Sequence, residues 1–147
     1  MTEAKQTTDG TSLVGACLCG AVTIALTDPR QDIAVCHCRM CQRWGGGAFL
    51  GVSAASFSVD GRDDVTAYRS SDWAERVFCT ICGSNLWYRY VPGDHYSFLA
   101  GLFSGGGGDF AMGEQIYIDE KPGHYDFTAD TPKLTGAETK AKYGVGG

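Results

Sequence analysis

Apolar and polar residues alternate with a period of two along most of this chain, and helical periodicity is scarce. This alternation is the pattern of half-buried β-strands, because successive side chains of a strand point to opposite faces. In residues 21–27, one face would carry the apolar side chains of Val22, Ile24 and Leu26. Further strands are expected at residues 48–59, 65–69, 76–79, 86–90, 96–102 and 115–119, separated by Gly, Pro, Asp and Ser turn signals. The pattern therefore predicts an all-β fold, with one helical turn at residues 40–44.

The length of the chain, 147 residues, is typical of a single domain. Residues 1–12 are polar and lack an apolar core segment, which favours a flexible N-terminal tail over a signal peptide. We place the domain at residues 13–128 and a C-terminal tail at residues 129–147. No apolar run approaches the roughly 18 residues that a membrane-spanning helix needs, so no membrane partner is expected.

The charge balance argues against a nucleic-acid partner. The formal net charge is −5, and the 12 Lys and Arg residues are dispersed, whereas phosphate backbones are bound by basic patches. The one small concentration of positive charge is formed by Arg39 and Arg43. A positive patch at this place would favour an anionic substrate.

The spacing of the seven cysteines carries most of the functional information. They form three tight clusters: Cys17 and Cys19, then Cys36, Cys38 and Cys41, and finally Cys79 and Cys82. Two thiolates one or two residues apart can bind one metal ion, because a tight turn points both sulfurs at the same place. The first and last pairs together supply the four sulfurs of a closed structural zinc site. The middle cluster supplies three, which leaves a fourth coordination position, as in catalytic zinc sites. We therefore expect two zinc ions per chain.

Other interpretations of the cysteines remain open. Disulfides would leave one of the seven thiols unpaired, and nothing marks the chain as secreted, so a reducing, cytoplasmic compartment is expected. A single zinc ion, with the other thiols packed in the interior, also fits the spacing. His37 could complete the middle site, although a residue between two ligands usually points away from their shared metal.

The cysteine motifs and their neighbours resemble those of the glutathione-dependent formaldehyde-activating enzyme family, which also includes centromere protein V. The matching segments are Gly15-x-Cys17-x-Cys19-Gly20-x-Val22, Cys36-His37-Cys38-x-x-Cys41-Gln42-Arg43 and Phe78-Cys79-x-x-Cys82-Gly83-Ser84-x-Leu86. The resemblance implies a β-tent, a single domain of antiparallel sheets stabilised by zinc. It also implies a structural zinc on the outer pairs and a catalytic zinc on the middle cluster. The implied activity is carbon–sulfur lyase chemistry, in which glutathione adds to formaldehyde, or a relative of that reaction.

Two positions near the end of the domain depart from the family pattern. Members often carry a histidine two residues before an aromatic residue, and Gln115 takes its place here. Tyr125 stands where a tryptophan would be expected after a Lys-x-Pro-like stretch. These departures weaken the transfer of formaldehyde as the particular substrate.

An enzyme is the leading interpretation of the middle cluster. A zinc ion held by three thiolates can take a substrate thiol as its fourth ligand and lower the pKa of that thiol, which suits reversible addition to an aldehyde. His37 is the candidate proton shuttle. The approach of an anionic, peptide-like thiol such as glutathione would be lined by Arg39, Arg43 and Trp44. Two alternatives stay open, a non-catalytic scaffold or interaction module held by two zinc ions and a redox sensor with oxidisable thiolates. The sequence does not predict the oligomeric state.

Overall fold

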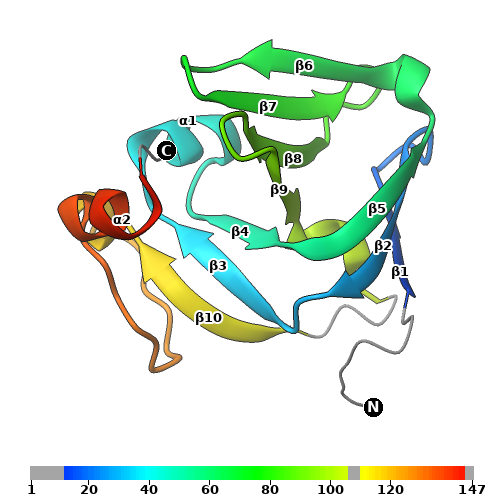
Figure 1. Ribbon diagram of the computed structural model, residues 1–147. Coiled ribbons are helices and arrows are strands. Elements are labelled where there is room, and N and C mark those ends of the chain that lie inside the picture. The colour runs from blue at the N-terminus through cyan, green and yellow to red at the C-terminus, as the bar shows by residue number, and fades with distance from the viewer. Residues whose placement is uncertain (1–11, 106–109, 145–147) are drawn as a thin grey trace.

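The computed structural model describes residues 12–105 and 110–144, which form ten β-strands, two α-helices and three short 3-10 helices (Figure 1). The strands are β1 (Ser12–Ala16), β2 (Thr23–Pro29), β3 (Asp32–Cys36), β4 (Phe49–Val52), β5 (Ala54–Asp60), β6 (Val65–Arg69), β7 (Ala74–Cys79), β8 (Asn85–Tyr90), β9 (His95–Leu99) and β10 (Ala111–Ile116). The α-helices are α1 (Arg39–Gly45) and α2 (Gly136–Tyr143), and the 3-10 helices are η1 (Arg62–Asp64), η2 (Ala100–Phe103) and η3 (Ile118–Glu120).

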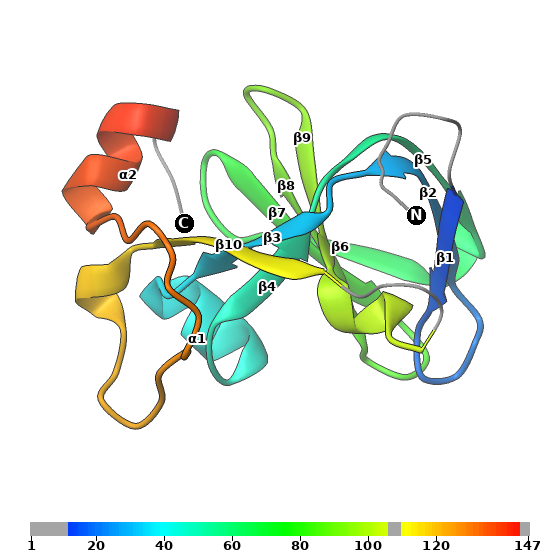
Figure 2. The ribbon, with the colours of Figure 1, turned by 90° about the horizontal axis from the view of Figure 1, so that it is seen from below.

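The strands form two open sheets. A three-stranded sheet has the order β1-β2-β5, and a seven-stranded sheet has the order β10-β3-β4-β9-β8-β7-β6. Neighbouring strands are antiparallel except for β10 and β3, which run parallel. The three-stranded sheet lies toward one end of the molecule and the two α-helices toward the other (Figures 1 and 2). The predicted all-β, single-domain architecture is confirmed.

The main hydrophobic core lies between the two sheets. Val22, Ile24 and Leu26 are fully buried in it, so the period-two prediction for the second strand is confirmed. From the large sheet the core receives aromatic rings, and Phe98 on β9 packs edge-on against Phe57 of the small sheet, with ring centroids 4.9 Å apart. Burial of these side chains is the main force that holds the sheets together.

The structure contains β1 and β3, which the pattern did not predict, and it divides or shortens three of the predicted strands. The apolar run 48–59 forms two strands instead of one, because the chain leaves the large sheet after β4 and enters the small sheet at β5. The strand expected at 96–102 ends at Leu99 and continues as η2. The strand expected at 115–119 ends at Ile116, because Tyr117 adopts a left-handed backbone conformation with φ of 56°.

The chain beyond residue 128, which we expected to be a tail, contacts the edge of the large sheet. The N–H of Gln115 on β10 donates to the carbonyl of Pro132, and the N–H of Leu134 donates to the carbonyl of Gln115, each over 2.9 Å. Helix α2 then begins with a capping box, in which Thr135 and Glu138 satisfy one another's backbone N–H groups. Among the described residues, no helix is long and apolar enough to cross a lipid bilayer.

Candidate functional site

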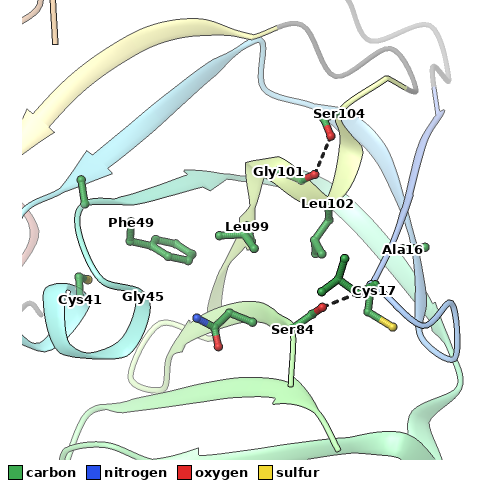
Figure 3. Close-up of a pocket in the computed structure, with 13 residues that line it drawn as sticks. Ala16, Cys17, Cys41, Gly45, Phe49, Ser84, Leu99, Gly101, Leu102 and Ser104 are labelled. Carbon is green, nitrogen blue, oxygen red and sulfur yellow. Dashed lines mark hydrogen bonds between the residues drawn. The ribbon is translucent and has the colours of Figure 1, made fainter. Parts of the chain in front are cut away.

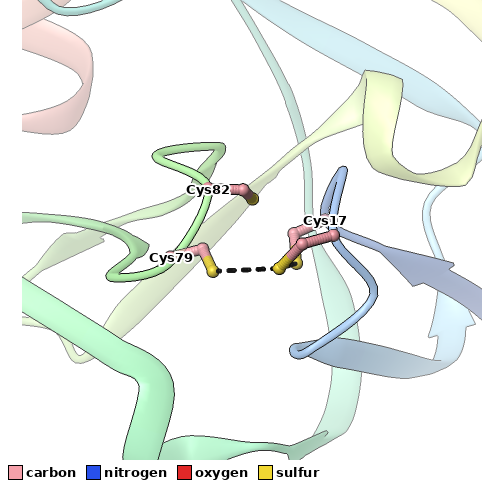
Figure 4. Close-up of side chains that lie close together, drawn as sticks. Cys17, Cys79 and Cys82 are labelled. Carbon is pink, nitrogen blue, oxygen red and sulfur yellow. Dashed lines mark hydrogen bonds between the residues drawn. The ribbon is translucent and has the colours of Figure 1, made fainter.

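The outer cysteine cluster joins the two sheets. Cys17 and Cys19 lie between β1 and β2, and Cys79 and Cys82 lie at the turn between β7 and β8 (Figure 4). All four sulfurs lie within 4.8 Å of one another. The Sγ of Cys19 lies 3.6 Å from that of Cys17 and 3.8 Å from that of Cys79. Four sulfurs about 2.3 Å from a tetrahedral zinc ion would be about 3.8 Å apart, so the cluster fits a closed zinc site.

Two glycine-ended turns shape this cluster. The N–H of Gly20 donates to the carbonyl of Cys17, and the N–H of Gly83 donates to that of Cys79. Both glycines have a left-handed φ, 80° and 78°, which a residue with a Cβ adopts only at an energetic cost. Hydrogen bonds from Ser84 lower the pKa of Cys82 to about 5, so this sulfur is available as a thiolate at neutral pH. The Cys-x-Cys-Gly and Cys-x-x-Cys-Gly spacings thus build the site locally.

The middle cluster is formed by the end of β3 and the start of α1. Cys36 is the last residue of β3, Cys38 is the N-cap of α1 and Cys41 lies in its first turn; all three are buried. Their sulfurs lie within 4.8 Å of one another, and no fourth His, Cys, Asp or Glu side chain of the described residues joins the group. The predicted three-sulfur arrangement is therefore present in the fold, with a coordination position left over for a tetrahedral ion.

The three buried thiols cannot all ionise by themselves. Hydrogen bonds with the thiols of Cys38 and Cys41, and then burial, raise the pKa of Cys36 well above its ordinary value. Hydrogen bonds from Cys36 and Cys41 lower the pKa of Cys38 to about 2. One thiolate is thus stabilised at the expense of its neighbours. A bound cation is what a cluster of three thiolates requires, and the sulfur donors fit zinc.

A cavity of about 620 Å³ lies between the two clusters, and Cys41 and Cys17 both line it (Figure 3). Its walls are of mixed character, with apolar side chains that include Phe49, Leu99 and Leu102 and polar side chains beside them. The polar side chains in the lining already have partners in the protein. Asn85 donates to the carbonyl of Trp44, Ser104 donates to the carbonyl of Gly101, and Ser84 accepts from the N–H of Leu18. The cavity therefore gives a small molecule access to one sulfur of the middle cluster, that of Cys41.

His37 is fully buried, and both of its ring nitrogens are hydrogen-bonded. Nε2 lies 2.8 Å from Oε1 of Gln115, and Nδ1 lies 2.8 Å from the hydroxyl of Tyr125. Because the amide nitrogen of Gln115 donates to Thr131, its oxygen faces His37 as an acceptor. The network therefore assigns the proton to Nε2 and makes Nδ1 the acceptor of the Tyr125 hydroxyl. Burial lowers the pKa of His37, which is consistent with a neutral ring.

The two positions that depart from the family pattern, Gln115 and Tyr125, thus act as partners of one histidine. The Tyr125 ring lies close to that of His37, with centroids 5.6 Å apart. Burial, and then the charges of Cys36 and Cys41, raise the pKa of the Tyr125 phenol, so its hydroxyl lies within electrostatic reach of the middle cluster. Sequence patterns do not predict this contact, because Gln115 and Tyr125 are separated from His37 by 78 and 88 positions.

The predicted substrate residues Arg39, Arg43 and Trp44 all lie on α1. Arg39 and Arg43 are exposed, and neither lines the cavity. The ring of Trp44 stacks on Phe49, a cavity wall, with centroids 5.4 Å apart. A role for these three residues in binding a thiol stays a prediction.

Sequence reasoning missed one residue beside the middle cluster. Arg76 on β7 is 3% exposed, and its Nη1 donates to the Sγ of Cys41 over 3.5 Å. We expected a strand to begin at this residue but assigned no role to its side chain. A signal was present in the alternation of β7, because Arg76 falls on the same face as buried Ala74.

Comparisons with known proteins agree with this geometry. A family model described as glutathione-dependent formaldehyde-activating enzyme matches residues 12–120. An uncharacterized lyase of Schizosaccharomyces pombe is 33% identical over 122 residues, which cover 82% of this chain and 89% of that protein. The crystal structure of a Rhodobacter sphaeroides protein superposes with a TM-score of 0.53 at 23% identity and covers 68% of this chain and 99% of that one. The last likeness concerns the fold alone.

Proposed function

This chain belongs to the glutathione-dependent formaldehyde-activating enzyme family, and we propose that it is a zinc-dependent carbon–sulfur lyase that joins a thiol to formaldehyde or a related aldehyde. The observation that carries the proposal is the three-cysteine cluster at the cavity, which has three sulfur ligands and no fourth among the described residues. The lyase named among its relatives supports the same reaction class. Glutathione is the thiol that the family name suggests.

In the proposed reaction, the thiol sulfur forms a bond to the aldehyde carbon, the carbonyl π bond breaks, and the thiol proton ends on the former carbonyl oxygen. A zinc ion held by Cys36, Cys38 and Cys41 would supply a fourth position for the thiol and lower its pKa. The N–H of Cys41 donates to the Sγ of Cys38 over 3.4 Å and would stabilise negative charge there.

We propose that His37 acts on a proton through Tyr125. The ring of His37 is fully buried, and both nitrogens are already engaged, so it has no direct path to a substrate in the cavity. The Tyr125 hydroxyl is half-buried and donates to Nδ1 of His37. Tyr125 does not line the cavity, but the charges of Cys36 and Cys41 act on its phenol, so a proton released at the middle cluster could reach the histidine by way of this hydroxyl.

The test is to measure zinc content and turnover on the same preparation. We expect about two zinc ions per chain and exchange between formaldehyde and its glutathione adduct, followed by NMR with labelled formaldehyde. Tyr125→Phe should keep both ions and slow the exchange, while exposed Tyr68→Phe serves as the matched control. Two ions without exchange for glutathione or any thiol of a small panel would reject the enzyme and favour the scaffold.

A further inference from the structure

A buried positive charge borders the middle cysteine cluster. Arg76 is 3% exposed, and in the described part of the chain no salt bridge joins its guanidinium to a carboxylate. Among the described residues, its one hydrogen-bond acceptor is the Sγ of Cys41, 3.5 Å from Nη1. Because burying an unpaired charge is very unfavourable, Arg76 needs an anion nearby. The cysteine cluster is the group in contact with it that can carry negative charge.

Two aromatic rings hold the guanidinium at this place. Its central carbon lies 5.1 Å from the ring centroid of Trp44 on α1 and 5.1 Å from that of Tyr88 on β8. Tyr88 is the cross-strand neighbour of Arg76, so the sheet register fixes this contact. The rings attract the cation but accept no conventional hydrogen bond, and within the described residues Nε and Nη2 have no hydrogen-bond partner. The negative charge that offsets the buried guanidinium of Arg76 must therefore come mainly from the cysteine cluster.

The net charge of the metal-loaded cluster shows why a cation beside it matters. A divalent ion with three thiolates carries a net charge of −1, and Arg76 brings the sum to zero. If a thiolate then becomes the fourth ligand, the sum is −1 with Arg76 and −2 without it. In a buried site of low effective dielectric constant, the extra charge is strongly disfavoured. Arg76 thus changes both the retention of the ion and the choice of its fourth ligand.

We propose that Arg76 is the counter-charge of the three-cysteine centre, which allows the buried ion to keep three thiolates and to accept a thiolate as its fourth ligand. The second half of this inference rests on the proposed function. Arg76 is a positioning residue, because it acts on the centre through Cys41, which also lines the cavity. A substrate thiolate is therefore less unfavourable as the fourth ligand than it would be at the same centre without Arg76.

The test compares Arg76→Met, which removes the charge and keeps an unbranched stem, with Arg76→Lys, which keeps the charge. Zinc affinity is measured by competition with a chelator, and the Cys38→Ser variant identifies which of the two ions belongs to the middle cluster. We expect Arg76→Met to weaken zinc binding at that cluster by about 10- to 100-fold, the usual effect of removing a partner of a metal ligand. Arg76→Lys should stay within a few-fold of the wild type. Arg89→Met is the control, because Arg89 lies on β8 and pairs with Glu75 and Asp94 away from the cysteines.

A second readout follows the fourth ligand. In the cobalt-loaded protein, thiolate-to-metal absorption is recorded while glutathione or 2-mercaptoethanol is added. Arg76→Met should raise the dissociation constant of both thiols at least tenfold. If Arg76→Met does not fold, Arg76→Gln takes its place, since it also removes the charge.

The proposal would be overturned if Arg76→Met or Arg76→Gln bound zinc and thiols as tightly as the wild type. It would also be overturned if Arg76→Lys lost as much zinc affinity as Arg76→Met, because the shape of the arginine, and not its charge, would then matter. A wild-type protein that turns over no thiol, but loses zinc on Arg76→Met, would reject the proposed function and leave the counter-charge in place. An active wild type whose Arg76→Met variant has unchanged zinc and thiol affinities would support the proposed function and reject the counter-charge.

Discussion

Cys38 combines two roles, because its sulfur belongs to the middle cluster and also caps helix α1 by accepting the N–H of Cys41. Serine is among the best N-cap residues and would keep this hydrogen bond. Replacing the thiol with a hydroxyl therefore separates metal binding from helix capping.

Cys38→Ser should lower zinc from about two ions to about one per chain and abolish thiol–aldehyde turnover. The thermal transition should move by only a few degrees, because the cap remains and the outer cluster still joins the sheets. Metal analysis and calorimetry on the same sample check this. A large fall in Tm together with the loss of one ion would mark the middle cluster as structural and favour the scaffold.

His37 makes folding stability depend on pH in a predictable direction. Burial lowers its pKa in the folded chain from the ordinary value of 6.5, so below that pH the unfolded chain binds a proton that the folded chain does not. The contribution of His37 to the free energy of unfolding is complete above pH 6.5. It is lost as the pH falls toward the pKa of the folded chain, by up to about 1.4 kcal/mol per pH unit. Urea unfolding at pH 7.5 and 5.5 should show a steeper loss for the wild type than for His37→Gln. Equal losses would mean that His37 titrates normally in the fold.

At the scale of elements, the C-terminal segment supports the histidine network. Thr131 accepts from Gln115, whose oxygen meets His37, and the backbone of residues 132–134 bonds to β10 before α2 begins. Helix α2 anchors this segment, because the N–H of Gly136 donates to Asp119 of η3. The start of α2 is therefore coupled to the site, although it lies beyond the residues matched by the family model.

Thr135→Ala removes the side chain that caps α2 and should lower the free energy of unfolding by about 1 kcal/mol. The zinc content should stay unchanged, while the NMR signal of the Nε2 proton of His37 should broaden or exchange faster as the segment loosens. Lys140→Gln, at an exposed position of the same helix, is the control. A normal His37 signal in a destabilised Thr135→Ala protein would show that α2 and the network are independent.

The elements also show what the sequence could and could not predict. Alternation predicted β2, since its pattern follows from the burial of one face, and cysteine spacing predicted the turns of both clusters, since each turn is local. It missed β3 and also β1, where exposed Val14 follows buried Leu13 and the inward Gly15 has no side chain to mark the face. The division of residues 48–59 into two strands depends on which sheet each half joins. The role of the Arg76 side chain depends on its contacts with Cys41, Trp44 and Tyr88, which are distant in sequence. Tertiary partners of this kind leave no periodic trace.

At the scale of the whole molecule, the outer cluster brings together four sulfurs from turns of the two sheets. Cys17 and Cys19 belong to the small sheet's turn, and Cys79 and Cys82 to a turn of the large sheet. A metal shared by Cys19 and Cys79 would close a loop across 60 positions of sequence. Metal binding at such a site contributes directly to the free energy of folding.

Cys79→Ser should therefore unfold or aggregate the domain, in contrast to Cys38→Ser. Cys79 is fully buried, so the variant also leaves a hydroxyl without its metal in the interior. Circular dichroism and size-exclusion chromatography of the two variants side by side check the contrast. A well-folded Cys79→Ser protein that retains two ions would show that the outer pairs do not share a metal.

The different sequence span of the two clusters has a consequence for synthesis on the ribosome. The middle cluster is complete once residue 41 has left the exit tunnel, whereas the outer cluster must wait for residue 82. Contacts between distant residues form late because their loops must close first. We expect the nascent chain to acquire its ions in this order, the reactive centre before the structural one. The growing polypeptide would then carry a metal-bound segment while the sheets that later bury it are still being made.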